Sequence, residues 1–125
     1  MYRLLLVTEN KDAFSDFASG LSTHAVVELA WAESGSMALD MVANTPVDLV
    51  VADEDLGDMS GLKLAYKVLS VNPMINCAVA SGLSHEDFHE ASEGLGLLEQ
   101  LPLQPGAEQA DDLLQQLKKI KNLSV

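Results

Sequence analysis

Carboxylates and a hydroxyl follow three of the short apolar runs in this sequence. Glu9 comes just after the first run, Asp53 directly after the third and Ser81 directly after the fourth. Two carboxylates placed together repel each other unless a cation neutralises them, so Glu9 and Asp53 favour a hard, oxygen-liganded ion such as Mg²⁺. A carboxylate beside Mg²⁺ can accept a phosphoryl group, because the metal screens the incoming oxygens while Asp53 supplies the nucleophile.

The elements that would position these residues alternate regularly along the chain. Five apolar runs are typical of strands buried on both faces, and they cover residues 4–7, 25–31, 47–52, 75–80 and a weaker 97–101. Helical patterns cover roughly residues 13–21, 37–42, 62–69, 84–93 and 113–120. This alternation predicts an α/β fold with a doubly wound parallel sheet and helices on both faces. No linker or repeat divides residues 1–125, so we expect one domain.

Ligands of doubly wound folds bind beyond the carboxyl ends of the strands, where the strand order reverses. Glu9 and Asp53 would face each other there from adjacent strands, with Ser81 at the end of the next strand. Asp53 by itself is equally consistent with a solvated turn, but the three residues together favour a functional site. The other acids of that turn have the simpler interpretation of solvated turn formers: Glu54, Asp55 and Asp58.

Serine and proline mark the predicted helix ends. Candidate N-caps are Ser34 or Ser36 for the second helix, Ser60 for the third and Ser84, together with Asp87, for the fourth. Pro46 and Pro73 end the second and third helices, because the residue before a proline avoids the helical region. The fourth helix has the weakest apolar face, which predicts a loosely packed element.

Composition excludes several classes of function. The chain has 48% hydrophobic residues and a formal net charge of −12, which argues against disorder and against direct binding of nucleic acid. Lys118, Lys119 and Lys121 form one basic cluster, whose simplest role is to oppose a helix dipole.

The cysteine content and the apolar runs indicate the compartment. Cys77 is the single cysteine, so no internal disulfide can form, and its apolar surroundings predict a buried, unreactive thiol. No stretch approaches the ~20 apolar residues that span a bilayer, and no signal peptide is visible. We expect a cytoplasmic protein with no membrane partner.

Other ligand sites fail on spacing. A calcium-binding loop starting at Asp53 would need a glutamate where Leu64 stands. No glycine-rich phosphate loop follows the first strand. His85 and His89 share a helix face, but a solvated pair is the better interpretation. A hydrolase or phosphatase has little support, because no histidine falls at a strand end.

Residues 47–53 read Val-Asp-Leu-Val-Val-Ala-Asp, and residues 54–62 read Glu-Asp-Leu-Gly-Asp-Met-Ser-Gly-Leu. This segment, within residues 3–123 as a whole, resembles the receiver domain of two-component response regulators. The segment follows the family pattern D-L-V-L-L-D-x-x-L-P-x-M-x-G-L, apart from Gly57 where proline is usual. The resemblance implies a flavodoxin-like fold with five parallel strands in the order 2-1-3-4-5.

The resemblance also implies site roles. Asp53 would accept a phosphoryl group from a histidine kinase or phosphotransfer protein, and the Ser81 hydroxyl would contact that group. Glu9, Asp53 and the backbone carbonyl of Asp55 would hold Mg²⁺. The domain would not be an enzyme beyond self-catalysed phosphorylation and dephosphorylation.

Three departures from the family pattern weaken these roles. Thr8 stands where the first acid of the metal-binding pair is usual. The lysine that precedes a proline after the fifth strand is absent, and its place falls to Gln104 or to Leu101, with Gln104 preferred for its distance to the next helix. Gln104 carries no charge, so it would lose a contact worth roughly 1.5–3 kcal/mol. The aromatic switch residue of the fifth strand is replaced by Leu101 or Leu98.

Two hypotheses follow. In the first, the domain accepts a phosphoryl group on Asp53 and signals to a downstream protein through its fourth helix, fifth strand and fifth helix. In the second, it is a phosphorylation-independent pseudo-receiver that docks a protein partner or forms a homodimer through its fourth and fifth helices. The well-preserved turn around Asp53 favours the first hypothesis, and Thr8, Gln104 and the missing aromatic residue favour the second.

Overall fold

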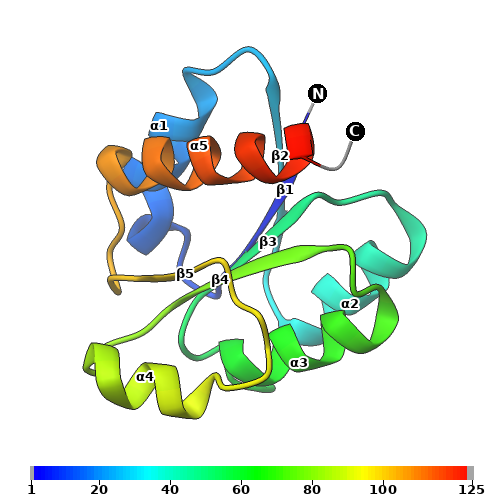
Figure 1. Cartoon of the computed structure of the whole chain (residues 1–125), viewed down its shortest axis with the longest axis vertical. Helices are drawn as coiled ribbons and strands as arrows, with labels where there is room; N and C mark the ends of the chain where they lie inside the picture. The colour runs from blue at the N-terminus through cyan, green and yellow to red at the C-terminus, as the bar shows by residue number, and fades with distance from the viewer. Residues whose placement is uncertain (1, 124–125) are drawn as a thin grey trace.

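Five parallel strands form one sheet in this computed structural model, which describes residues 2–123 and side chains through residue 121. The strands are β1 (Tyr2–Val7), β2 (Val27–Ala32), β3 (Leu49–Ala52), β4 (Asn76–Ala80) and β5 (Glu99–Leu101). Their order is β2-β1-β3-β4-β5 (Figure 1). The predicted fold class and strand order are confirmed.

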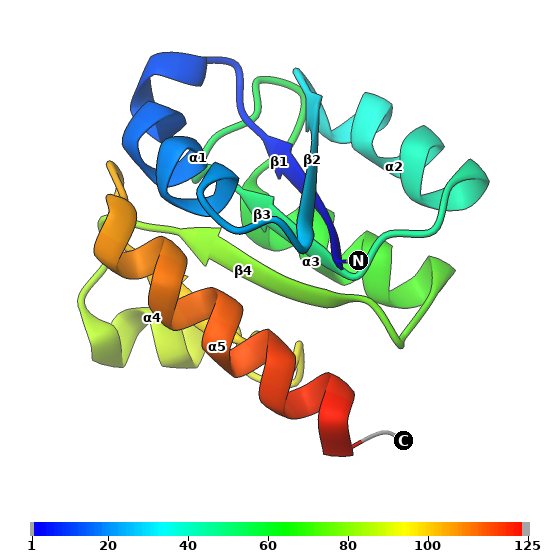
Figure 2. The ribbon, with the colours of Figure 1, turned by 90° about the horizontal axis from the view of Figure 1, so that it is seen from above.

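Helices cover both faces of this sheet. They are α1 (Ser15–Ser22, preceded by the 3₁₀ turn η1, Lys11–Phe14), α2 (Gly35–Asn44), α3 (Gly61–Val71), α4 (His85–Ala91) and α5 (Ala107–Leu123). Helices α1 and α5 lie on one face, and α2, α3 and α4 lie on the other (Figures 1 and 2). Side chains alternate along β1, so Leu4 and Leu6 pack toward α1 and α5 while Leu5 and Val7 pack toward the opposite helices.

The helix ends follow the predicted signals. Ser34, rather than Ser36, caps α2: its hydroxyl accepts a hydrogen bond from the Met37 amide at 3.1 Å. Ser60 caps α3 and Ser84 caps α4 in the same way, each at 3.1 Å. Helices α2 and α3 end one residue before the residue that precedes each proline, as the steric argument requires.

The elements that differ most from expectation lie at the two edges of the sheet. Strand β2 begins at Val27, because residues 25–26 form a turn that enters the strand. Strand β5 has only three residues, so residues 97–98 precede it rather than belong to it. Helix α4 buries Phe88 alone, which agrees with its weak apolar face.

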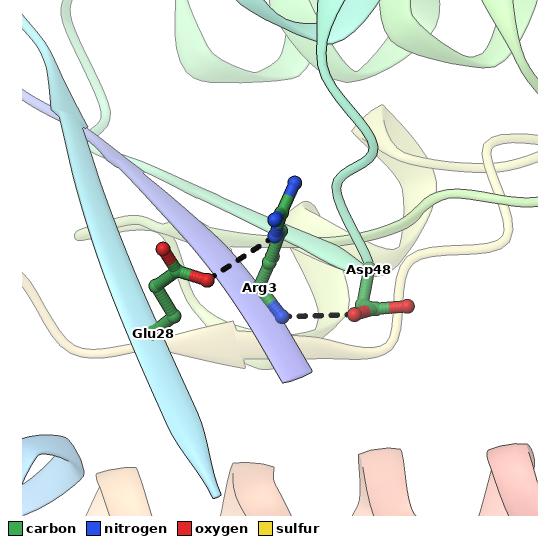
Figure 3. A network of polar contacts seen from close by, with 3 residues as sticks. All are labelled: Arg3, Glu28 and Asp48. Carbon is green, nitrogen blue, oxygen red and sulfur yellow. Dashed lines mark hydrogen bonds and ion pairs between the residues drawn. The ribbon is translucent and has the colours of Figure 1, made fainter. Parts of the chain in front are cut away.

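Asp48, the first acid of the motif, anchors the amino ends of the strands. One of its carboxylate oxygens accepts a hydrogen bond from the Arg3 amide at 2.8 Å, and the other pairs with Lys121 of α5 at 3.0 Å. The Arg3 side chain turns instead to Glu28 on β2, with Nε 3.2 Å from the carboxylate (Figure 3). This network lies at the opposite end of the strands from Asp53, so Asp48 has a structural role.

None of the helices among residues 2–123 combines the length and the apolar character that crossing a membrane demands.

The buried thiol of Cys77 gives a first prediction. Burial on β4 raises the pKa of this thiol from 9.0 to about 12, which lowers its thiolate fraction about 1,000-fold. Ellman's reagent at mildly alkaline pH should therefore react about 1,000-fold more slowly with the native protein than with the protein in denaturing guanidinium chloride. Native reactivity close to that of the unfolded chain would contradict the buried position of this cysteine.

Candidate functional site

Three polar residues follow the central strands at their carboxyl ends. Val7 pairs with Ala52, and Ala52 pairs with Val79. Thr8, Asp53 and Ser81 therefore emerge together at the carboxyl ends of three neighbouring strands. The chain leaves β1 toward α1 on one face and leaves β3 toward α3 on the other. The gap between β1 and β3 is therefore the point where the strand order reverses, which is where ligands of such folds bind.

Thr8 contacts Asp53 directly. Its hydroxyl lies 2.8 Å from Asp53 Oδ2 and 3.1 Å from the carbonyl oxygen of Asn10. A hydroxyl carries one proton, and the charged carboxylate at the shorter distance is the stronger acceptor. The Thr8 oxygen in turn accepts a hydrogen bond from the Asn10 amide at 3.0 Å. Thr8 is 1% exposed, so it is a buried donor with its hydrogen bonds satisfied.

Asp53 is half-buried, and its second carboxylate oxygen is held by backbone. Oδ1 accepts a hydrogen bond from the Glu54 amide at 2.8 Å, and the Asp53 amide donates to the Val7 carbonyl at 2.9 Å. Within residues 2–121 no lysine, arginine or histidine pairs with this carboxylate. Hydroxyl and amide donors alone fix the orientation of Asp53.

The loop after Asp53 closes on itself before α3 begins. The Leu56 amide donates to the Met59 carbonyl at 2.9 Å, and the Gly61 amide donates to the Glu54 carbonyl at 3.0 Å. Gly61 starts α3 directly against β3: a Cβ at this position would overlap the Asp53 carbonyl oxygen. The glycine of the motif therefore lets the helix approach the backbone of Asp53.

Glu9 reaches this loop at Gly57, the position where proline is usual. Gly57 has a positive φ of 83°, a conformation that favours glycine, and a Cβ there would overlap a carboxylate oxygen of Glu9. Glu9 and Gly57 thus fit each other, because the long Glu9 side chain takes the space that a larger residue at position 57 would occupy. Asp55 supports the same turn by accepting the Gly57 amide at 2.9 Å.

Asp58 joins the loop to the start of α2. Its two carboxylate oxygens accept hydrogen bonds from the Gly35 amide at 3.0 Å and the Ser36 amide at 2.9 Å. These hydrogen bonds, with that of Ser36 the larger contribution, hold the pKa of the Asp58 carboxyl below its ordinary value of 3.8. A carboxylate at a helix N-terminus is also favoured by the helix dipole. The turn sequence predicts a solvated acid at Asp58, whereas in the structure this carboxylate fixes the loop to the start of α2.

Ser81 is buried, with 7% of its surface exposed, at the end of β4. Its hydroxyl accepts a hydrogen bond from the Leu83 amide at 3.1 Å, and its own amide donates to the Leu101 carbonyl at 2.9 Å. Ser81 and Asp53 share no hydrogen bond in the described part of the chain. The next amide, that of Gly82, donates to a carboxylate oxygen of Glu54 at 2.7 Å.

Leu101, and not Gln104, occupies the end of β5. Leu101 pairs with Ala80, is 1% exposed and directly precedes Pro102. Gln104 lies three residues beyond the strand, exposed, and the structure brings it into no side-chain hydrogen bond with Asp53 or Ser81. Neither residue supplies a positive charge to the site.

The residues that could hold a divalent cation form an incomplete set. Among residues 2–121 no group of three or more histidine, cysteine or acidic side chains converges on one point. Asp53 and Glu9 remain as carboxylates, and the Asp55 carbonyl lies on the same loop. Mg²⁺ commonly uses one or two carboxylates and completes its shell with water and phosphate oxygens. Two carboxylates and one carbonyl therefore suffice for a magnesium site of low affinity.

The contacts of Glu54 and Asp58 are the part of the site that sequence reasoning missed. Each joins segments more than 20 residues apart, and no local motif marks either contact. Glycine at position 57 in place of proline is a usable signal for a different contact, that of Glu9 with this loop.

These observations define a doubly wound α/β domain with an acidic site at its switch point. No family model matches the chain. A curated response regulator receiver protein of Anaeromyxobacter sp. (strain Fw109-5) is 29% identical over 102 residues, which is 82% of this chain and 42% of that protein. The chain thus spans less than half the length of that relative.

Solved structures share the fold over nearly the whole chain. A two-component response regulator from Clostridium difficile has a TM-score of 0.84 at 15% identity, covering 98% of this chain and 99% of its own. The signal receiver domain of an HD domain-containing protein from Pseudomonas fluorescens Pf-5 has a TM-score of 0.84 at 19% identity, covering 98% and 90%. At these identities the structures establish the fold, and with the curated relative they confirm the resemblance to response-regulator receiver domains.

Gly61 provides a test of the site's packing. Gly61→Ala should lower the free energy of unfolding by about 1–3 kcal/mol, because the added methyl must displace the helix from the Asp53 carbonyl. Gly106→Ala is the matched control: a Cβ there meets Gln109 Oε1 at an ordinary 3.5 Å. Urea denaturation of both variants compares the two, and equal stabilities would contradict the close approach at Gly61.

Asp58 predicts a pH-dependent contribution to stability. Because its pKa is lower in the folded than in the unfolded state, the contribution is present above the unfolded carboxyl pKa and is lost as pH falls through the folded value. Asp58→Asn should therefore melt at a lower temperature than the wild type near neutral pH, and the difference should shrink as the pH falls toward about 3. Melting curves across this range measure it, and a constant difference would exclude a role for the charge.

Proposed function

We propose that this domain is a phosphoacceptor whose Asp53 receives a phosphoryl group from a histidine kinase or phosphotransfer protein. In the transfer, a carboxylate oxygen of Asp53 attacks the phosphorus while the bond to the donor's nitrogen or oxygen breaks. The observation that carries the proposal is the fixed, half-buried Asp53 carboxylate at the switch point, held by Thr8 and the Glu54 amide. Ser81 stands on the neighbouring strand with a hydroxyl that can turn toward the transferred group.

Mg²⁺ would be held by Asp53, Glu9 and the Asp55 carbonyl. When bound, it would screen the negative charge of the phosphoryl oxygens. A solved response regulator from Burkholderia pseudomallei, with a TM-score of 0.76 at 18% identity covering 100% of this chain and 74% of its own, carries a phosphorylated aspartic acid and a calcium ion. Affinity for Mg²⁺ should be modest here, because Thr8 contributes a hydroxyl in place of a carboxylate.

The output of the domain would be a protein contact made through α4, β5 and α5. Helix α4 is the element most able to move, since Phe88 is its single buried residue. A hollow of about 350 Å³ separates it from β5, lined in part by His89, Leu97 and Gln100. Phosphorylation would shift the population of α4 positions and so change the affinity for a downstream partner.

A second candidate function is a docking module that needs no phosphorylation, either with another protein or as a homodimer. The end of β5 favours this alternative: neither the buried Leu101 nor the exposed Gln104 can supply the positive charge with which a lysine would assist phosphoryl binding. Thr8 favours it too, because Asp53 is satisfied by a neutral donor without any cation.

Incubation with acetyl phosphate and Mg²⁺, followed by cold quenching and intact mass measurement, separates the two functions. We expect a phosphoryl adduct on the wild type that is absent from Asp53→Asn and absent when Mg²⁺ is chelated. Asn preserves the shape of the side chain and removes the nucleophilic carboxylate, so it is the matched control.

Two other outcomes would contradict the proposal. An adduct that forms on Asp53→Asn would place the acceptor elsewhere. No adduct on the wild type at any time would reject the phosphoacceptor function and leave the docking module.

A further inference from the structure

Glu54 spans the site from the loop after β3 to the loop after β4. Its carboxylate oxygen Oε2 accepts a hydrogen bond from the Gly82 amide at 2.7 Å, across 28 positions of sequence. The Glu54 backbone is fixed at the same time, because its amide donates to Asp53 Oδ1 and its carbonyl accepts from the Gly61 amide. The negatively charged side chain of the residue after Asp53 is thus held against the loop that follows β4.

The amides that follow β4 form an anion-accepting corner. The Gly82 amide donates to Glu54, and the next amide, of Leu83, donates to the Ser81 hydroxyl at 3.1 Å. Successive backbone amides that point to one side make a fixed site for negative oxygens. Strand β4 neighbours β3, so a phosphoryl group on Asp53 would lie near the Gly82 and Leu83 amides.

No lysine, arginine or histidine among the described residues holds Glu54 in place. Its side chain is exposed, no ion pair in the described residues includes it, and ordering a free glutamate costs side-chain entropy. The charge-assisted hydrogen bond to Gly82 is the contact that offsets this cost.

We propose that Glu54 is an internal anion that occupies the Gly82 amide in place of a phosphoryl oxygen and so restrains phosphorylation of Asp53. This inference rests on the proposed phosphoacceptor function and adds its control. An incoming phosphodonor meets the negative charge of Glu54 and finds the Gly82 amide already bonded. Phosphorylation requires Glu54 to leave, and its departure frees the loop that leads from Ser81 into α4.

The same displacement alters a small pocket on this side of the sheet. A cavity of about 230 Å³ is lined in part by Glu54, Ser81, Leu62 and Leu83. Because Glu54 forms one wall of this cavity, its departure would widen the cavity between the loops that follow β3 and β4. The change at the site is thereby coupled to the residues that begin α4.

Two variants separate the charge of Glu54 from its hydrogen bond. Glu54→Gln keeps the shape and an acceptor oxygen without the charge, and Glu54→Ala removes both. Asp40→Asn, at an exposed position on α2, is the control for the loss of one negative charge. Each protein is labelled with acetyl phosphate and Mg²⁺, with the adduct followed by intact mass, and the Gly82 amide is followed in ¹H–¹⁵N spectra without phosphodonor.

We expect the Gly82 amide to shift upfield in Glu54→Ala, because it loses a charged acceptor. Labelling should be about tenfold faster in Glu54→Ala than in the wild type, intermediate in Glu54→Gln and unchanged in Asp40→Asn. The acetyl group leaves as acetate when the Asp53–phosphorus bond forms, so no further reactant is needed.

The possible failures are distinguishable. An unshifted Gly82 amide, or equal labelling rates in wild type and Glu54→Ala, would overturn the inference while leaving Asp53 as a phosphoacceptor. No adduct on any of the four proteins would overturn the proposed function and this inference with it.

Discussion

The hydrogen bond between Thr8 and Asp53 is the contact on which the rest of the site depends. It follows directly from the parallel pairing of β1 with β3, which brings the first residue after each strand together. A second carboxylate at position 8 would repel Asp53 and would require a cation for stability. The Thr8 hydroxyl instead donates a hydrogen bond, so the two strand ends meet without this repulsion and Asp53 keeps a fixed orientation.

The acids around Asp53 are satisfied by backbone amides in the same manner. Asp58 bonds the first amides of α2, Asp55 bonds the Gly57 amide, and Glu54 bonds the Gly82 amide. In a chain with a net charge of −12, few lysines and arginines are available to pair with acids. Amides held by strands and helices serve well in their place, because they are already positioned and lose no side-chain entropy on bonding.

The contacts between acids and backbone amides bear on both the phosphoacceptor function and the docking function. A phosphoacceptor needs an accessible carboxylate and free donors for the phosphoryl oxygens, and Asp53 provides the first. The donors exist too, but Glu54 holds one of them in the ground state. Under the proposed function, the unphosphorylated state would be stabilised by this contact, and a docking function would use the same surface without any transfer of phosphate.

Sequence patterns determined the fold and the residues that line its carboxyl edge. Apolar runs of strand length, serine caps at residues 34, 60 and 84, and prolines after α2 and α3 are local signals, and each acts within a few residues of the chain. The motif from residue 47 to residue 62 added the receiver resemblance and identified Asp53. Local signals were weakest for β5, which has only three residues and ends at Leu101, while Gln104 lies three residues beyond it.

Only the tertiary structure decided how these residues are used. The contacts of Thr8 with Asp53, Glu54 with Gly82 and Asp58 with α2 join segments 22 to 45 residues apart. Such contacts depend on strand register and on where each loop turns, and a turn-forming acid has the same local sequence whether it faces solvent or a distant amide. The sequence by itself therefore specified which side chains reach this edge of the sheet, and the packing of β1, β3 and β4 specified their partners.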